Sequence, residues 1–584
     1  MKQWDGKRIA GLLVPAFALR RADDLGIGDT QAIKEAIDFC ARNNIALLQL
    51  LPINETGGDN SPYNAISACA LDPALLTVSP NTIPGLGEEE FQQLAPPKTL
   101  QAIRSSSIDY PVVKKLKMDL LRAAFTSLVS EKNSKSIERD SFAAFKRENQ
   151  DWLESYALFR TLVDEHAGNA CWTSWDKVLQ EPAGALQWLK LSRESDRLTK
   201  SLDFFSFVQW LAARQWDELK THAEAQNVFL MGDIPFGVSR YSADVWANQP
   251  LFDLTWSGGA PPEHFFQGDE FTRRWGQNWG IPLYHWQAHK QEGFAWWRRR
   301  IAHTVRFFHY FRIDHVLGFF RIYSFPWQPE KNQDFTDLTE DQVKRVTGGR
   351  LPRFIPRDDY PAALGLMNKT EGKELLTMVV QAAGKAGVVA EDLGVVPDYV
   401  RPLLKELGIP GCSVPVFERL ADQSFKPKET LPPLSLCTYG THDHEPIATY
   451  YENLVRWWHG SDGDNGWKEV QRIMKFLGLD ANEAPTEYTQ NLQFAFFKAL
   501  LQTPCWLAVL IITDLLGTKQ RFNEPGLAGD YNWSQRLDQP IGNYETDGNY
   551  ADKIRYFKKL IIETNRVANP TAQKLAANPE EIKN

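Results

Sequence analysis

The residues with the clearest capacity for chemistry are four acids, each at or just after the end of a short apolar run. They are Asp233, Asp314, Glu391 and Asp443. An acid on an apolar strand is costly to bury unless it is paired or functional, and a single one is commonly a salt-bridged structural residue. Four of them at equivalent places are harder to explain by structure alone, so the pattern favours a shared functional site.

Two carboxyl groups with a third acid nearby are what retaining chemistry at a glycosidic bond requires. One carboxylate attacks the anomeric carbon, while the other is protonated to release the leaving oxygen and then ionised to activate the acceptor. Arg312 lies two residues before Asp314, so on a strand both side chains point to one face and the guanidinium keeps Asp314 ionised. Glu391 is then the acid whose pKa should be raised, and His442 is a candidate for hydrogen bonds to sugar hydroxyls.

Other chemistries fit the sequence less well. The run from His442 to Glu445 reads HDHE and lacks the helical spacing of HExxH, so no metal site is expected. A GxSxG elbow is missing, which disfavours Ser-His-Asp hydrolysis. The formal net charge of -8 and the sequence pI of about 5.9 argue against a nucleic-acid partner, which would need a basic face.

The elements that must position these acids are short apolar runs separated by helical patterns, an alternation typical of a parallel sheet. Helical periodicity is clear at Ile33–Arg42, Ala295–Phe308 and Glu371–Ala386. The eight candidate strands are Gly11–Ala16, Ala46–Pro52, Val228–Pro235, Tyr310–Asp314, Val388–Glu391, Cys412–Phe417, Leu434–Tyr439 and Leu507–Thr513.

Eight such strands predict an α/β protein with a (β/α)8 TIM barrel, in which chemistry gathers at the carboxyl ends of the strands. The alternative is an open doubly wound sheet. It would need a glycine-rich phosphate turn after the first strand, and Pro15-Ala16-Phe17-Ala18 is not such a turn.

We expect one elaborated catalytic barrel over residues 1–584, with insertions in its loops. Residues 75–205 are predicted to form a helical subdomain between strands two and three, because the gap far exceeds an ordinary βα connection. Its helical patterns include Val112–Leu128, Phe142–Glu165 and Phe204–Asn227. Residues 327–370 are polar, contain Gly348-Gly349 and are predicted to be a surface insertion.

The compartment is predicted from the cysteines and the N-terminus. Six scattered cysteines without a CxxC pair indicate reduced thiols and a cytoplasmic protein. Basic residues before the apolar run Ile9–Leu19 are typical of a secretory signal. Asp5 in the basic region and Pro15 in the run argue against such a signal, and the same residues also fit a first buried strand. No apolar run reaches membrane-spanning length, so no membrane partner is expected.

With these residues in place, the sequence from about Ile9 to Leu537 resembles glycoside hydrolase family 77, the amylomaltases or disproportionating enzymes. The resemblance lies in Gly26-Ile27-Gly28-Asp29, Ser61-Pro62-Tyr63, Gly232-Asp233-Ile234-Pro235, the stretch Ser242–Asn248, Arg312-Ile313-Asp314-His315, Ala390-Glu391-Asp392-Leu393-Gly394, Gly440-Thr441-His442-Asp443, Asp514-Leu515-Leu516-Gly517 and Asn523-Glu524-Pro525-Gly526 with Asn532-Trp533.

The resemblance implies a 4-alpha-glucanotransferase that moves alpha-1,4-glucan segments between maltooligosaccharides or starch- and glycogen-derived glucans, without cofactor or metal. It implies that Asp314 is the nucleophile, Glu391 the general acid/base and Asp443 the acid that stabilises the distorted sugar. For substrate binding it implies roles for Arg312, which orients Asp314, for His442 on the same sugar, and for Tyr63 near the cleft.

The segment that covers the acceptor, residues 255–290, departs from the family pattern. The family's PPD is Pro261-Pro262-Glu263 here, and its GQxWGNPLY is Gly276-Gln277-Asn278-Trp279-Gly280-Ile281-Pro282-Leu283-Tyr284 after several extra residues. We expect Glu263, Gln277 and Trp279 to contact substrate, although Trp279 and Tyr63 could also be core aromatics. Asp233 either bridges barrel layers or shapes the substrate site.

Two other functions remain open from the sequence. An alpha-amylase-type hydrolase would use the same acids, because sequence does not set the partition between water and sugar acceptors. A catalytically silent glucan-binding protein would use the 20 tryptophans, but the presence of Asp314 and Glu391 disfavours it. We expect a monomer or a weak homodimer.

Overall fold

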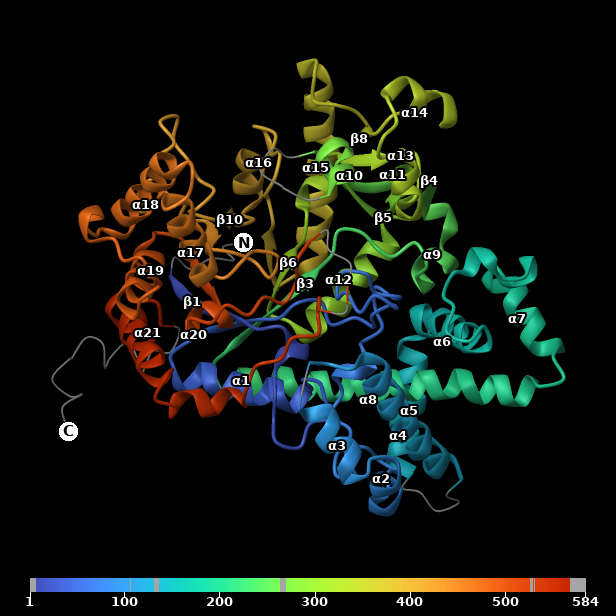
Figure 1. The fold of residues 1–584 in the computed structure, drawn as a ribbon. Helices are drawn as coiled ribbons and strands as arrows, with labels where there is room; N and C mark the ends of the chain where they lie inside the picture. The colour runs from blue at the N-terminus through green and yellow to red at the C-terminus, as the bar shows by residue number, and fades with distance from the viewer. Residues whose placement is uncertain are drawn as a thin grey trace.

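Eight parallel strands form the central sheet within the part of the chain that the computed structural model describes, which is residues 7–105, 107–130, 136–262, 269–525, 529 and 531–567 (Figure 1). The strands are β1 (Ile9–Leu13), β2 (Leu47–Gln49), β3 (Phe229–Ile234), β6 (Tyr310–Ile313), β9 (Gly387–Ala390), β10 (Gly411–Ser413), β11 (Ser435–Cys437) and β12 (Leu507–Ile511). Each lies in or overlaps one of the eight predicted runs, so the sequence prediction of the strands is confirmed.

The sheet curls into a nearly closed barrel. Its strand order is β10-β11-β12-β1-β2-β3-β6-β9, and the first and last strands meet where the backbone N–H of Ala390 donates to the carbonyl of Pro410 at 2.8 Å. In β1 and β12 every residue is buried, because a barrel strand packs against the interior on one face and against helices on the other. The fold is the predicted (β/α)8 barrel.

Helices surround this sheet, and their apolar faces follow the helical period. In α1 (Thr30–Arg42) the buried residues include Ile33, Ala36, Ile37 and Cys40. The other helices around the barrel are α12 (Ala295–Phe307), α15 (Ala362–Ala383), α16 (Val400–Leu407), α19 (Gln490–Gln502) and α21 (Ala551–Glu563), with the short helices α9 (Ala243–Ala247), α11 (Trp286–Gln291) and α20 (Ile512–Leu516) in the connections.

Between β2 and β3 the chain runs through a group of helices at one side of the barrel (Figure 1). They are α2 (Glu88–Leu94), α3 (Pro97–Arg104), α4 (Tyr110–Ser130), α5 (Ser136–Glu148), α6 (Gln150–Glu165), α7 (Pro182–Leu191) and α8 (Ser195–Ala225). The 31 residues of α8 span about 45 Å, so this helix both belongs to the group and leads the chain back to the barrel.

A smaller antiparallel sheet occupies part of the region that the sequence suggested was a covering loop and a surface excursion. In the described residues its strand order is β5 (Gln277–Tyr284), β4 (Phe252–Ala260), β7 (Ile322–Phe325), β8 (Arg353–Ile355), and α10 (Glu270–Trp275), α13 (Asn332–Phe335) and α14 (Glu340–Val346) pack beside it. The described residues of the expected covering segment include most of β4, all of α10 and all of β5, and Phe271 and Trp275 of α10 share a small apolar core with Phe325, Trp327 and Phe335. We refer to this unit as the small-sheet lobe.

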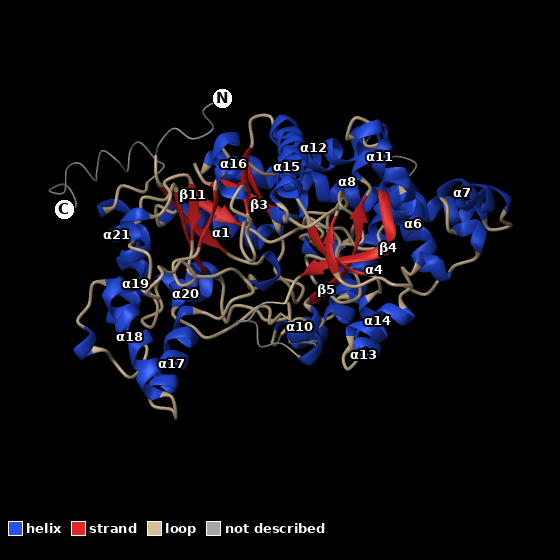
Figure 2. Ribbon diagram, turned by 90° about the horizontal axis from the view of Figure 1, so that it is seen from above, coloured by secondary structure: helices blue, strands red, loops and turns tan. Residues whose placement is uncertain are grey.

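A second lobe, the helical lobe, consists of α17 (Ile447–Trp458) and α18 (Gly463–Leu477), which follow β11. Figures 1 and 2 place it on one side of the barrel mouth, with the small-sheet lobe on the other. Within the described residues, no helix combines the length and the apolar character needed to cross a membrane. All six cysteines lie in the described part and are free.

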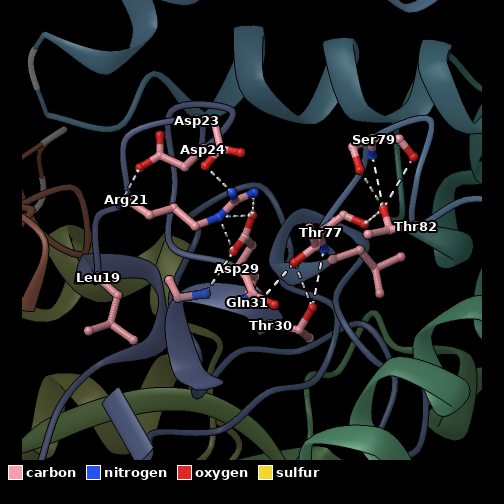
Figure 3. Close-up of polar contacts among 12 residues, drawn as sticks. Leu19, Arg21, Asp23, Asp24, Asp29, Thr30, Gln31, Thr77, Ser79 and Thr82 are labelled. Carbon is pink, nitrogen blue, oxygen red and sulfur yellow. Dashed lines mark hydrogen bonds and ion pairs between the residues drawn. The ribbon is translucent and has the colours of Figure 1, made fainter. Parts of the chain in front are cut away.

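The first motif of the sequence, which ends at Asp29, ties the N-terminal loops together (Figure 3). Asp29 caps α1 by accepting from the backbone N–H of Ala32, and it receives the buried guanidinium of Arg21 at 2.8 Å. Next to it, the hydroxyls of Thr30 and Thr77 are 2.8 Å apart, which fastens the segment after β2 to the start of α1. Asp29 therefore has a structural role.

We expect Asp29→Ala to lower the free energy of unfolding by about 3 kcal/mol, because it leaves the Arg21 cation buried without its partner and removes a helix cap. The measurement is urea unfolding followed by circular dichroism. Asp23→Ala is the matched control, since Asp23 pairs with the same Arg21 but its side chain is 77% exposed. Equal losses in the two variants would contradict the structural role of Asp29.

Candidate active site

A cleft of about 2700 Å³ opens at the carboxyl ends of the barrel strands and extends between the two lobes. Asp314, Glu391 and Asp443 line it, and β5 of the small-sheet lobe contributes Gln277 and Trp279. The strand-end acids of the sequence therefore reach one cavity, except that the side chain of Asp233 is fully buried behind it.

Arg312, on β6, joins the buried part of the site to its open part. Its Nη2 atom lies 2.7 Å from Asp233 Oδ2 and 2.8 Å from Asp314 Oδ1, and the Nε atom also donates to Asp233. The Arg312 side chain is 4% exposed, while that of Asp314 is 33% exposed. Burial alone would lower the pKa of Arg312, but the combined effect of Asp233, Tyr63 and Asp314 holds that pKa well above its usual value. Asp233 thus fixes the cation that in turn orients Asp314.

Glu391 follows β9 and is held by main-chain donors. The backbone N–H groups of His315 and Leu393 donate to its two carboxyl oxygens at 2.7 and 2.9 Å. His315 has a φ of 49°, a left-handed conformation that turns its N–H toward Glu391. Burial, and then the negative charge of Asp314, raise the pKa of Glu391 to about 8, although both backbone donors oppose the shift.

The two carboxyl groups of Asp314 and Glu391 titrate as a pair. Burial raises the pKa of Asp314 to about 6, with Arg312 acting in the opposite direction. Asp314 also faces the open cleft and is the more solvated of the two, so it loses its proton first. At neutral pH the pair therefore shares one proton, and that proton resides on Glu391.

The environment of Asp443 differs from those of Asp314 and Glu391. Its Oδ1 atom accepts from the Asn523 amide at 2.6 Å and lies 3.2 Å from Nε2 of His442, and Arg521 donates to its backbone carbonyl. Burial alone would raise the pKa of Asp443, but His442 and the Asn523 hydrogen bond outweigh burial and hold the pKa below its ordinary value. Asp443 stays ionised next to a carboxyl that keeps its proton.

Aromatic rings pack along the floor beside Asp443. The rings of Tyr63 and His442 stack with centroids 4.7 Å apart, and Trp533 packs against both. The Tyr63 hydroxyl donates to Asp233 at 2.7 Å and lies 3.2 Å from Arg312. The structure therefore brings Tyr63 and His442 into the same network as the acids.

Two of the three residues expected to contact an acceptor, Gln277 and Trp279, lie on β5 of the small-sheet lobe. Trp279 is 39% exposed, its indole N–H donates to Gln277 Oε1 at 3.2 Å, and its ring meets the ring of His315 edge-on. Ile281, which replaces the family's Asn, packs against Gly237 and Gly258, where an added Cβ would collide with it. Glu263 lies outside the described residues.

Sequence reasoning gave no role to several residues that hold the site. Asn523 and Arg521 clamp Asp443, and Trp533 supports Tyr63, yet all come from the segment after β12. The only signal was the family-like run from Asn523 and the Asn532-Trp533 pair. Within the described part of the chain, no group of three or more His, Cys, Asp or Glu is placed to hold a metal ion.

A (β/α)8 barrel whose cleft holds a coupled pair of carboxyl groups defines a class of enzymes that act on glycosidic bonds. A profile of glycoside hydrolase family 77, described as 4-alpha-glucanotransferase, matches residues 14–540. The chain belongs to this family, the 4-alpha-glucanotransferases.

Individual relatives agree with this assignment. The chain is 29% identical over 568 residues to a 4-alpha-glucanotransferase of Chlamydia pneumoniae, covering 93% of this chain and 94% of the relative. It is 30% identical over 549 residues to one of Synechocystis, covering 91% and 95%. The fold is similar to that of an amylomaltase from Streptococcus agalactiae in complex with acarbose, with a TM-score of 0.70 at 22% identity over 96% of this chain and all of that one.

We expect Asn523→Ala to lower kcat/KM for glucan transfer about tenfold to a hundredfold, because a hydrogen bond to a charged group is lost from Asp443. Asn523→Asp should lower it further, since a like charge then faces Asp443. Steady-state kinetics with maltotriose measure the effect, and Asn482→Ala, at an exposed asparagine, is the control. Full activity in both Asn523 variants would show that Asp443 does not depend on this contact.

Proposed function

We propose that this protein transfers alpha-1,4-glucan segments between maltooligosaccharides by a retaining double displacement in which Asp314 is the nucleophile and Glu391 the general acid/base. The observation that carries the proposal is the unequal protonation of the pair. Arg312 holds Asp314 as an oriented carboxylate, while burial and the charge of Asp314 keep a proton on Glu391. These are the two states that the first step requires.

In the first step, a carboxylate oxygen of Asp314 forms a bond to the anomeric carbon as the bond from that carbon to the leaving oxygen breaks. Glu391 gives its proton to the leaving oxygen, and a glucosyl ester of Asp314 results. In the second step Glu391, now ionised, takes the proton from the 4-hydroxyl of an acceptor sugar. The acceptor oxygen bonds to the anomeric carbon and Asp314 departs as a carboxylate.

Asp443 and His442 are proposed to bind the hydroxyls of the sugar at the reacting centre. A permanently ionised Asp443 also stabilises the positive charge that develops on the ring in an oxocarbenium-like transition state. Its hydrogen bonds to Asn523 and its contact with His442 fix its position before the reaction, so no reorganisation is needed as the charge appears.

Transfer, in preference to hydrolysis, is favoured by the placement of Gln277 and Trp279. Both line the cleft, with the Trp279 ring against that of His315, and they supply an aromatic face and an amide on which an acceptor sugar can rest. A sugar held there displaces water from the ester. The alternative, an alpha-glucan hydrolase, would use the same acids but would not need these contacts.

The substrates, compartment, cofactor requirement and oligomeric state of the enzyme are also part of the proposal. We propose that starch- or glycogen-derived glucans supply its substrates, that it works in the cytoplasm with its six cysteines reduced, and that it needs no metal or cofactor. We also propose that it is a monomer or a weak homodimer.

Incubation with maltotriose is the direct test of transfer. We expect glucose together with a ladder of longer maltooligosaccharides, while the total of reducing ends stays constant because each transfer breaks one bond and makes one. Chromatography and a reducing-end assay on the same samples provide the measurement. Asp314→Asn should lower the rate at least about a thousandfold, as for the loss of other catalytic nucleophiles. Rising reducing ends would identify a hydrolase, and binding without rearrangement would identify a silent glucan-binding protein.

The pH dependence follows from the coupled pair. Activity requires an ionised Asp314, so kcat/KM should rise as pH passes through about 6. It also requires a protonated Glu391, so kcat/KM should fall as pH passes through about 8. The expected profile with maltotriose is therefore a bell between these limbs. A profile that keeps rising beyond about pH 8 would contradict the assignment of Glu391 as the acid.

A further inference from the structure

Among the described tryptophans only Trp279 and Trp457 are exposed, at 39% and 40%, and both line the same cleft. The other described tryptophans are buried or half-buried. Trp279 lies on the small-sheet lobe near the catalytic acids, whereas Trp457 lies near the end of α17 in the helical lobe. An exposed indole loses the stabilisation of burial, so two of them in one cavity point to a ligand that covers them.

The exposure of Trp457 follows from the way α17 is divided between two faces. Its buried stripe includes Ile447, Tyr451 and Val455 and packs on the protein. A neighbouring stripe of Tyr450, Leu454 and Trp457, spaced by four and three residues, lines the cleft, and along it exposure rises from the buried Leu454 to the exposed Trp457. One helix therefore carries an apolar strip along the wall of the cavity, and Trp457 is its outermost member.

A tight hairpin after β10 packs beside the helical lobe, where Arg419 pairs with Glu469 of α18. Within it, the backbone N–H of Lys426 donates to the carbonyl of Glu418 at 2.9 Å, and Phe417 and Leu420 are 56% and 44% exposed. Both apolar side chains line the cleft. The strip on α17 and these two residues form a groove that continues from the catalytic centre; we call it the distal groove.

Paired charges border the distal groove. Arg419 lies 3.1 Å from Glu469 of α18, and Lys426 lies 3.1 Å from Glu418. Each of these side chains also lines the cleft. Because the ion pairs already fix them, they offer hydrogen-bonding groups to a ligand without the entropic cost of ordering free side chains. An apolar face with oriented polar groups at its edges suits a sugar ring better than it suits a purely apolar ligand.

The side chain of Trp457 and the helix that carries it both have anchoring contacts. Its indole N–H donates to Asp462 Oδ2 at 3.2 Å, and the next residue, Trp458, stacks on Trp467 with centroids 4.4 Å apart. At the other end of α17, Asp514 Oδ1 accepts from the backbone N–H of Ile447 at 2.8 Å and ties the helix to the barrel. The platform is thus preorganised relative to the catalytic acids.

We propose that the distal groove is a binding site for the remote part of a long alpha-1,4-glucan chain, with Trp457 as its stacking platform. The proposal rests on the proposed transferase function and adds a chain-length preference to it. Trp457 is ten residues beyond Ile447, about 15 Å along α17, and Ile447 follows Asp443 by four residues, so Trp457 lies toward the end of α17 that is remote from Asp443 in the chain. A long chain reaches Trp457 and a trisaccharide at the catalytic centre does not.

Isothermal titration calorimetry in the Asp314→Asn background separates binding from turnover. Adding Trp457→Ala should raise the Kd of maltoheptaose about fivefold to twentyfold, as expected for a lost aromatic contact, and should change the Kd of maltotriose less than about twofold. In the otherwise wild-type enzyme, Trp457→Ala should lower the ratio of kcat/KM for maltoheptaose to kcat/KM for maltotriose by a similar factor.

Two further variants distinguish a platform from a structural role. Trp457→Phe keeps an aromatic face but loses the bond to Asp462, so it should retain most of the preference for maltoheptaose. Tyr360→Ala, which removes an aromatic ring that is 87% exposed and outside the cleft lining, should leave both ligands unaffected. Equal weakening for both ligands by Trp457→Ala, or none for maltoheptaose, would overturn the proposal. If the wild-type protein rearranges no maltotriose, the transferase function fails, while the calorimetric comparison still decides the distal groove.

Discussion

The guanidinium of Arg312 is the cation on which the site is built. It is almost completely buried, and a buried charge is tolerated only with a partner, which Asp233 provides from the neighbouring strand. Because Asp233 and Arg312 are registered opposite each other on β3 and β6, the barrel itself sets their geometry. Asp314 then takes its orientation from Arg312, and its charge helps to keep the proton on Glu391.

The sequence predicted the barrel well, because its strands are short, apolar on both faces and separated by helices. The small-sheet lobe was not predicted as a sheet. Its strand β4 contains Asp253, Thr255 and a pair of glycines, and it pairs with β5 through an irregular register, so no period of two is visible. Its small core is made by aromatic contacts between segments far apart in the chain, such as Phe271 with Phe325 and Trp275 with Trp327, and these contacts are not local properties of either segment.

The candidate site, like the fold, contains residues that the sequence could predict and residues that it could not. Acids at strand ends and an arginine two residues before one of them could be found from spacing, since barrel topology brings strand ends together. The residues that hold Asp443 could not be found in this way. The amide of Asn523 has no periodic spacing in the sequence, and it reaches Asp443 only because of the way its loop folds. The exposure of Trp457 was equally hidden, since composition does not separate a platform from the many tryptophans that fill the core.

The pairing of β12 with β1 also bears on how the chain is made. Among the barrel strands β1 is synthesised first, and its partner on one side, β12 (Leu507–Ile511), is synthesised last. Until then β1 presents an unpaired edge, and Asp443 lacks the clamp from Asn523 and Arg521. A nascent chain that already contains Asp314, Glu391 and Asp443 therefore still lacks a complete site, and its β1 edge is open to edge-to-edge association. Both the pairing of that edge and the activity depend on the synthesis of β12 and the segment after it.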